Sequence, residues 1–142
     1  MIQTVRKDIR KKPCRVNGTD GMQGGVFTVE TYRLLGNRAV QKGNGEDAIH
    51  FYSLALELDG RNHVLLSNRA AAYMLVNGFK DALLDAQRCI NLAPKYARGY
   101  SRKASALKGL QRWGDARQVY RHALAMFPED PGLLKGFAEM QA

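Results

Sequence analysis

Residues 63–96 read HVLLSNRAAAYMLVNGFKDALLDAQRCINLAPKY, and this stretch decides the fold because its pattern recurs without a gap on either side. When residues 29–62 and 97–130 are laid over it, small residues fall into columns with a period of 34. The columns are Gly36, Ala70 and Ala104; Ala48, Ala82 and Ala116; and Ala55, Cys89 and Ala123. The chain therefore contains three copies of one structural unit.

Each copy has the pattern of two antiparallel amphipathic helices. Apolar residues recur at three- and four-residue steps in two blocks, and the turns between the blocks are expected at Gly43 and Gly45, at Gly78 and at Gly114. Pro94 and Pro128 are expected to end the second helix of their copies, because proline disfavours helix in the residue before it. The pattern predicts helices over 29–42, 46–59, 63–76, 80–92, 97–110, 113–126 and 131–141.

One such hairpin cannot bury its own apolar face, whereas three stacked hairpins and a closing helix can. The sequence therefore predicts an all-α fold, an α-solenoid of three helix-turn-helix hairpins with a C-terminal capping helix over 131–141. The predicted domain is 29–142, with its repeats at 29–62, 63–96 and 97–130. Successive hairpins leave a groove lined by the first helix of each pair, and we expect the groove to hold a ligand.

The chain is basic, since 22 Lys and Arg against 13 Asp and Glu give a net charge of +9 over 142 residues. Such a balance indicates an anionic partner. Residues 1–28 are predicted to be a flexible basic tail, because six basic residues and several glycines occur there without apolar periodicity. A weak organelle-targeting or nuclear-import signal is the alternative interpretation of this stretch.

The two cysteines, Cys14 and Cys89, are too few for a disulfide scaffold and lack the paired spacing of a zinc site. We therefore expect no metal and no cofactor. The apolar runs are too short to cross a membrane, and the N-terminus has no apolar signal segment. These features predict a cytoplasmic protein without a membrane partner.

The repeat resembles the tetratricopeptide repeat (TPR) in its period of 34 and in the residues at its main positions. The matching residues include Tyr32, Leu35, Gly36, Tyr52 and Ala55 in the first copy and Ala104, Ala116, Tyr120, Ala123 and Pro128 in the third. The resemblance covers about 114 of the 142 residues. It implies the helical-hairpin solenoid and leaves the ligand open, because this repeat binds many unrelated partners.

A narrower resemblance concerns the polar residues of the predicted groove, Arg33, Asn37, Asn68, Arg98 and Arg102. They stand where co-chaperones of the Hsp70/Hsp90-organising type carry the Lys, Asn, Asn, Lys and Arg of a carboxylate clamp. The strings NHVLLSNRAAAY (62–73) and RGYSRKA (98–104) are also similar to the first three-repeat domain of that family. The resemblance implies binding of the acidic Glu-Glu-Val-Asp C-terminus of heat shock proteins 70 and 90. Arginine in place of the usual lysine at Arg33 and Arg98 leaves the ligand preference open.

The residues themselves suit such a chain end. Arg33 and Asn37 are four residues apart, as are Arg98 and Arg102, so each pair lies on one stripe of its helix. Stacking of the hairpins places Asn68 between the two pairs. A terminal Asp offers two carboxylates, which guanidinium groups bind through paired hydrogen bonds. Candidate apolar lining for a Val or Ile side chain of the peptide, with core packing as the competing role, is provided by Val40, Ala71, Met74 and Leu75.

We therefore expect a monomeric, non-enzymatic adaptor that binds C-terminal peptides of Hsp70 and Hsp90 with roughly micromolar affinity, weakened by salt. The histidines His50, His63 and His122 are scattered over different predicted helices, and no phosphate loop or nucleophile motif accompanies them. One alternative is a TPR scaffold that binds an internal segment of a partner. Another is a helical-repeat protein for single-stranded RNA, which the period of 34 disfavours.

Overall fold

The computed structural model describes residues 27–141, which form seven helices and, within that range, no strand. The helices are α3 (Val29–Gln41), α4 (Gly45–Leu58), α5 (His63–Leu75), α6 (Phe79–Leu92), α7 (Ala97–Gly109), α8 (Trp113–Met126) and α9 (Pro131–Gln141). Their bounds differ from the predicted ones by at most one residue, and the prediction of an all-α fold is confirmed. Residues 1–26 of the predicted basic tail lie outside the described residues.

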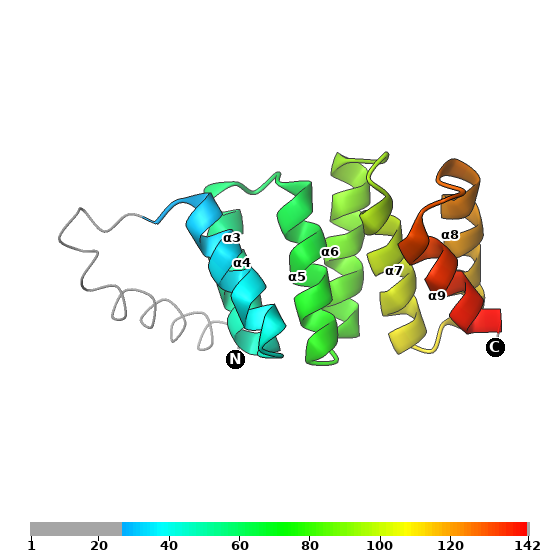
Figure 1. Ribbon diagram of the computed structural model, residues 1–142, viewed down its shortest axis with the longest axis horizontal. Coiled ribbons are helices and arrows are strands. Elements are labelled where there is room, and N and C mark those ends of the chain that lie inside the picture. The colour runs from blue at the N-terminus through cyan, green and yellow to red at the C-terminus, as the bar shows by residue number, and fades with distance from the viewer. Residues whose placement is uncertain (1–26, 142) are drawn as a thin grey trace.

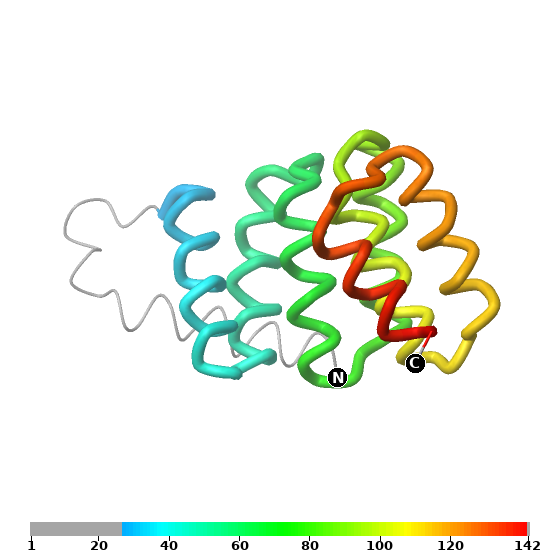
Figure 2. The backbone as a smooth tube through the Cα atoms, turned by 45° about the vertical axis from the view of Figure 1, so that its right-hand side comes forward, coloured from blue at the N-terminus to red at the C-terminus, as the bar shows by residue number. Residues whose placement is uncertain are grey.

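The helices form two layers (Figure 1). One layer holds α3, α5, α7 and α9, and the other holds α4, α6 and α8. Helix α5 contacts both α3 and α7, and α7 also contacts α9, whereas α4, α6 and α8 contact only helices of the first layer. Figure 2 shows the hairpins following one another along the molecule. The first helices of successive repeats therefore line one continuous face.

Side-chain caps fix where several helices begin, because a polar oxygen there accepts a hydrogen bond from a free backbone N–H of the first turn. Asn44 Oδ1 accepts from the backbone N–H of Asp47 at 3.1 Å, and Asn62 Oδ1 accepts from Leu65 at 3.1 Å. Thr28 caps α3 in the same way. The second helices of repeats two and three end just before Pro94 and Pro128, as expected.

The turn inside each hairpin contains one residue in the left-handed region of backbone space, at positions 34 residues apart. These residues are Gly43 (φ 75°), Asn77 (φ 60°) and Gln111 (φ 62°). The expectation that Gly45 and Gly114 would lie in these turns is wrong, because both fall in the first turn of a helix, α4 and α8. A non-glycine residue with positive φ is uncommon, so sequence patterns do not reveal this position in repeats two and three.

The columns of small residues lie at the contacts between helices. Ala48, Ala82 and Ala116 are completely buried, as are Ala55, Cys89 and Ala123. Gly36 has a specific role, because an added Cβ would lie 2.5 Å from a ring carbon of Tyr52. The Tyr52 ring of α4 therefore packs directly on the backbone of α3. This packing brings the Tyr52 hydroxyl to Asn37 in the first layer.

A buried ion pair within the second repeat also contacts the first repeat through Ser53. Arg69 on α5 donates from Nε and Nη2 to the two carboxylate oxygens of Asp85 on α6, at 2.6 and 2.8 Å. The Nη1 of Arg69 also donates to Ser53 Oγ on α4 at 3.0 Å. Asp85 is only 3% exposed. The Arg69 guanidinium therefore links three helices, through a buried bidentate ion pair with α6 and a hydrogen bond to α4.

The Cys89 thiol is expected to be unreactive in the folded protein. It is completely buried, and desolvation, the main cause, raises its pKa from 9.0 to about 11. The nucleophilic thiolate is therefore scarce at pH 8. In a Cys14→Ser variant, mass spectrometry after incubation with iodoacetamide should show no adduct in buffer and complete labelling in denaturant.

The same pKa predicts how Cys89 affects stability at high pH. Because its folded pKa lies above the unfolded value, the unfolded chain loses the thiol proton first as the pH rises. The contribution of the protonated Cys89 thiol to the free energy of unfolding is complete below pH 9 and is lost as the pH rises through about 11. A Cys89→Ala variant should lose less stability than the parent between these pH values in urea titrations, and an identical pH profile would contradict the assignment.

Candidate functional site

The five candidate clamp residues all lie on helices of the first layer. Arg33 and Asn37 are on α3, Asn68 is on α5, and Arg98 and Arg102 are on α7. Helix α5 contacts both α3 and α7, so the five residues lie on three neighbouring helices. Repeat-to-repeat stacking, rather than proximity in sequence, makes these helices neighbours.

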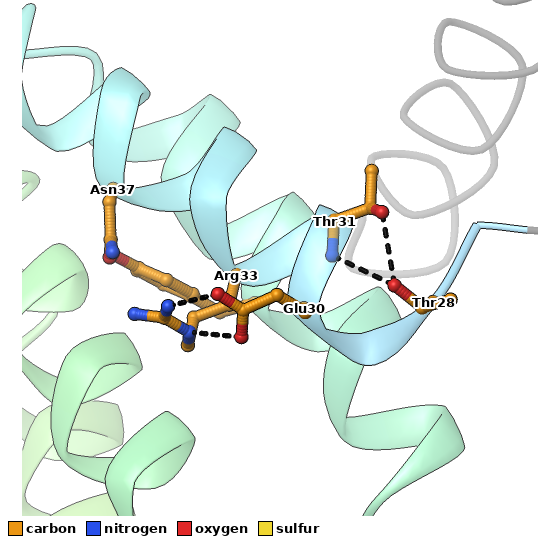
Figure 3. A network of polar contacts seen from close by, with 6 residues as sticks. Thr28, Glu30, Thr31, Arg33 and Asn37 are labelled. Carbon is orange, nitrogen blue, oxygen red and sulfur yellow. Dashed lines mark hydrogen bonds and ion pairs between the residues drawn. The ribbon is translucent and has the colours of Figure 1, made fainter.

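At the α3 end of the site, both polar residues already have partners. Asn37 Oδ1 accepts a hydrogen bond from the Tyr52 hydroxyl. Arg33 is held by Glu30, one turn earlier on α3, through both carboxylate oxygens, with Nε 2.9 Å from Oε1 and Nη2 on Oε2 (Figure 3). This contact lowers the pKa of Glu30, mainly through the hydrogen bond from Arg33.

At the α7 end, Arg102 lies against α5. Its Nε donates to the backbone carbonyl of Ser67 at 3.2 Å, immediately before Asn68. Burial, and then the positive charge of Arg98, lower the pKa of Arg102. A guanidinium stays protonated regardless, so two like charges one helical turn apart form a positive pole, which an anion would stabilise.

Tyr52 connects the two ends of the site. Burial raises the pKa of its phenol, and the positive charges of Arg33 and Arg102 both oppose that shift. Arginines from α3 and α7 therefore act on the same hydroxyl, which in turn orients the amide of Asn37. The arrangement is a strip of fixed hydrogen-bond donors and positive charge, which is suited to carboxylates.

A cavity of about 400 Å³ extends the site from Arg98 and Arg102 toward the start of α9. Its far wall contains Asp130, which caps α9 by accepting from the backbone N–H of Leu133 at 3.0 Å. The positive pole thus faces a single carboxylate across open space. A bound chain can continue past the two arginines in this direction.

The four candidate lining residues occupy different surroundings. Val40 is half-buried against the core around Tyr52, and Met74 packs on the buried cluster of Ala70, Ala82 and Ala106. Ala71 is half-buried on α5, and Leu75 is 49% exposed beside Gly45, at the start of α4. Val40 and Met74 therefore pack against the core, which is the competing role expected for them.

Three features of the site were not predicted from the sequence. They are the Glu30 carboxylate on Arg33, the Tyr52 hydroxyl on Asn37 and the Ser67 carbonyl on Arg102. The first could have been predicted from the sequence, because Glu30 and Arg33 are three residues apart and such residues are neighbours on a helix. The other two depend on contacts between helices.

Among residues 27–141, no group of three or more His, Cys, Asp or Glu side chains could hold a metal ion. In the same range, no helix is both long enough and apolar enough to cross a membrane.

No protein-family model matches the chain. The heat shock protein Sti1 homologue of Schizosaccharomyces pombe is 39% identical over 113 residues, which are 80% of this chain and 19% of the relative. The Hsp70-Hsp90 organizing protein of Triticum aestivum is 40% identical over 107 residues, which are 75% of this chain and 18% of the relative. The chain therefore spans about a fifth of the length of these curated relatives.

Among solved structures, the first TPR domain of Spaghetti (RPAP3), bound to the HSP90 peptide SRMEEVD, superposes with a TM-score of 0.73. It is 26% identical and covers 80% of this chain and 93% of that one. The fold and the groove thus define a tetratricopeptide-repeat domain. By its sequence, this TPR domain is homologous to a segment of the Sti1 homologue and of the Hsp70-Hsp90 organizing protein. The names of these relatives, a heat shock protein homologue and an Hsp70-Hsp90 organizing protein, agree with the prediction of a binding protein instead of an enzyme.

Proposed function

We propose that this TPR domain is a cytoplasmic adaptor that binds the acidic Glu-Glu-Val-Asp C-terminus of Hsp70, Hsp90 or both in the groove of its first layer. Arg33, Asn37, Asn68, Arg98 and Arg102 would hold the two carboxylates of the terminal Asp. The observation that carries the proposal is that the positive charges of Arg33 on α3 and Arg102 on α7 both act on the Tyr52 hydroxyl, which donates to Asn37, while α5 contacts both of these helices.

The geometry supports a chain end more than an internal segment. An internal segment presents mostly neutral backbone groups to the groove, and neutral groups do not need two neighbouring arginines. A terminal Asp brings two negative charges close together, which matches the positive pole at Arg98 and Arg102. The solved relative bound to a peptide ending in EEVD, and the name of the Hsp70-Hsp90 organizing relative, point to the same ligand class.

The test is a calorimetric titration with three ligands: a peptide ending in Glu-Glu-Val-Asp, the same peptide with a C-terminal amide, and single-stranded RNA of equal length. We expect a Kd on the order of micromolar for the free acid and a loss of affinity for the amide. Equal binding of acid and amide would favour an internal-segment scaffold. Tight binding of RNA alone would favour the nucleic-acid alternative.

Glu30→Gln is expected to strengthen peptide binding by about two- to fivefold, because Glu30 competes with the ligand for Arg33 and repels its carboxylates. The pKa of Glu30 is lowered, so this competition is fully present at pH 7. Titrations of the variant and of a control, Glu46→Gln on the exposed start of α4, measure the effect. Unchanged or weaker binding in Glu30→Gln would show that Glu30 positions Arg33 instead of competing for it.

A further inference from the structure

The second layer contains a cavity at one of its two equivalent inter-repeat gaps. Between α6 and α8, above α7, the open volume is about 690 Å³. At the equivalent gap between α4 and α6, above α5, it is only about 170 Å³. Since the two gaps are made by the same pair of repeat positions, a difference in side chains explains the difference in volume.

The gap between α4 and α6 is filled by the Arg69–Asp85 pair and its contact with Ser53. One period of 34 further along, these residues correspond to Lys103, Val119 and Gln87. The cation is thus retained on α7, whereas the carboxylate that would pair with it on α8 is replaced by valine. Each of these three residues lines the larger cavity.

Lys103 therefore lacks the partner that its equivalent has. It is half-buried, and among residues 27–141 the structure records no hydrogen bond or ion pair for it. Asp115, the acidic residue of the described cavity wall, is bound to Arg112 at 2.9 Å. Gln87 donates to Asn91 at 3.0 Å. A partly desolvated ammonium without a counter-charge favours binding of an anion.

The rim of the cavity is apolar and basic. Leu84 on α6 is 63% exposed, more than any other large apolar side chain recorded as exposed, and Val119 is half-buried opposite. The basic residues of the wall are Lys103 and Arg112. A ligand complementary to this surface carries a carboxylate for Lys103 next to an aliphatic side chain for Leu84 and Val119.

We propose that the α6–α8 cavity is a second docking site, which binds an acidic amphipathic segment of a partner protein. An Asp or Glu of that segment pairs with Lys103, as Asp85 pairs with Arg69, and an adjacent Leu or Val covers Leu84 and Val119. The site lies on the layer opposite the clamp, so one partner can bind at each layer. The proposal is independent of the ligand proposed for the clamp.

The probe is an acetylated, carboxy-amidated amphipathic peptide with Leu and Asp four residues apart, together with a matched peptide in which each Asp is Asn. The amide removes the terminal carboxylate that the clamp would bind. In amide chemical-shift titrations we expect the Asp peptide to perturb α6, α7 and α8 around Leu84, Lys103 and Val119. The Asn peptide should bind about two- to fivefold more weakly, as the loss of one charge pair predicts.

Two variants make the test specific. Lys103→Gln should weaken binding of the Asp peptide about two- to fivefold and leave binding of the Glu-Glu-Val-Asp peptide unchanged. Val119→Asp restores the acceptor that repeat two provides, so it should fill the cavity and block the Asp peptide. Arg102→Ala should have no effect on the Asp peptide. No binding at millimolar peptide, equal binding of the Asn peptide, or an unchanged affinity in Lys103→Gln would overturn the proposal.

Discussion

Arg102→Ala is expected to abolish measurable binding of a Glu-Glu-Val-Asp peptide while leaving the fold intact. Arg102 combines a guanidinium fixed on the Ser67 carbonyl with a position beside both Arg98 and Tyr52. A hydrogen bond to a charged group contributes about 1.5 to 3 kcal/mol, so loss of a bidentate contact should raise Kd by roughly a hundredfold or more. Calorimetry on the variant measures this loss.

The matched control is Arg121→Ala, which removes the same charge from an exposed position on α8. It should bind the peptide with nearly the parent affinity. Circular dichroism and thermal melting must be unchanged in Arg102→Ala, since its contact is with a carbonyl oxygen that lies within a helix. A melting temperature lowered as much as the affinity would mean that Arg102 is structural, and full affinity would remove it from the site.

The largest expected effect on stability is that of Asp85→Ala. It would leave the Arg69 guanidinium buried without its bidentate carboxylate, whose oxygens lie 2.6 and 2.8 Å away. Removing one partner of a buried pair typically destabilises a protein by about 3 to 5 kcal/mol. That is a large share of the roughly 5 to 15 kcal/mol by which a domain is stable. Urea titration should show the midpoint moving far to lower concentration.

The control is Asp115→Ala, which breaks an ion pair of the same type with Arg112, but one in which both side chains are more than half exposed. Exposed pairs contribute at most about 1 kcal/mol. A double variant, Arg69→Met with Asp85→Leu, should recover much of the lost stability because it removes both charges. A loss below about 1 kcal/mol for Asp85→Ala would show that water or a neighbour compensates for Arg69.

The sequence predicted the helices closely because a 34-residue repeat provides three independent copies of each boundary. Pro94 and Pro128 marked the helix ends, and the alanine columns marked the buried contacts. The turns were predicted less well, since Asn77 and Gln111 adopt a positive φ that glycine usually provides. Both residues are exposed, and local backbone hydrogen bonds of the turns accompany this conformation, from Gly78 N–H to the Tyr73 carbonyl at 2.8 Å and from Arg112 N–H to the Leu107 carbonyl at 2.9 Å. Composition alone does not show it.

For the site, the spacing rules identified residues on one stripe of a helix, such as Arg98 and Arg102. They did not identify what each side chain contacts. Tyr52 reaches Asn37 only because Gly36 lets its ring lie on the α3 backbone. The Ser67 contact of Arg102 is made to a backbone oxygen, which carries no residue-type signal. Contacts of this kind follow from helix packing and require the three-dimensional structure.

The most direct test of the central claim is to map where the peptide binds. Amide and side-chain chemical shifts should be recorded on the labelled chain during titration with a peptide ending in Glu-Glu-Val-Asp. We predict that the largest changes occur at Arg33, Asn37, Asn68, Arg98 and Arg102, and that the outer faces of α6 and α8 are unaffected. Changes centred on the α6–α8 cavity, or no saturable changes at the five clamp residues, would contradict the account.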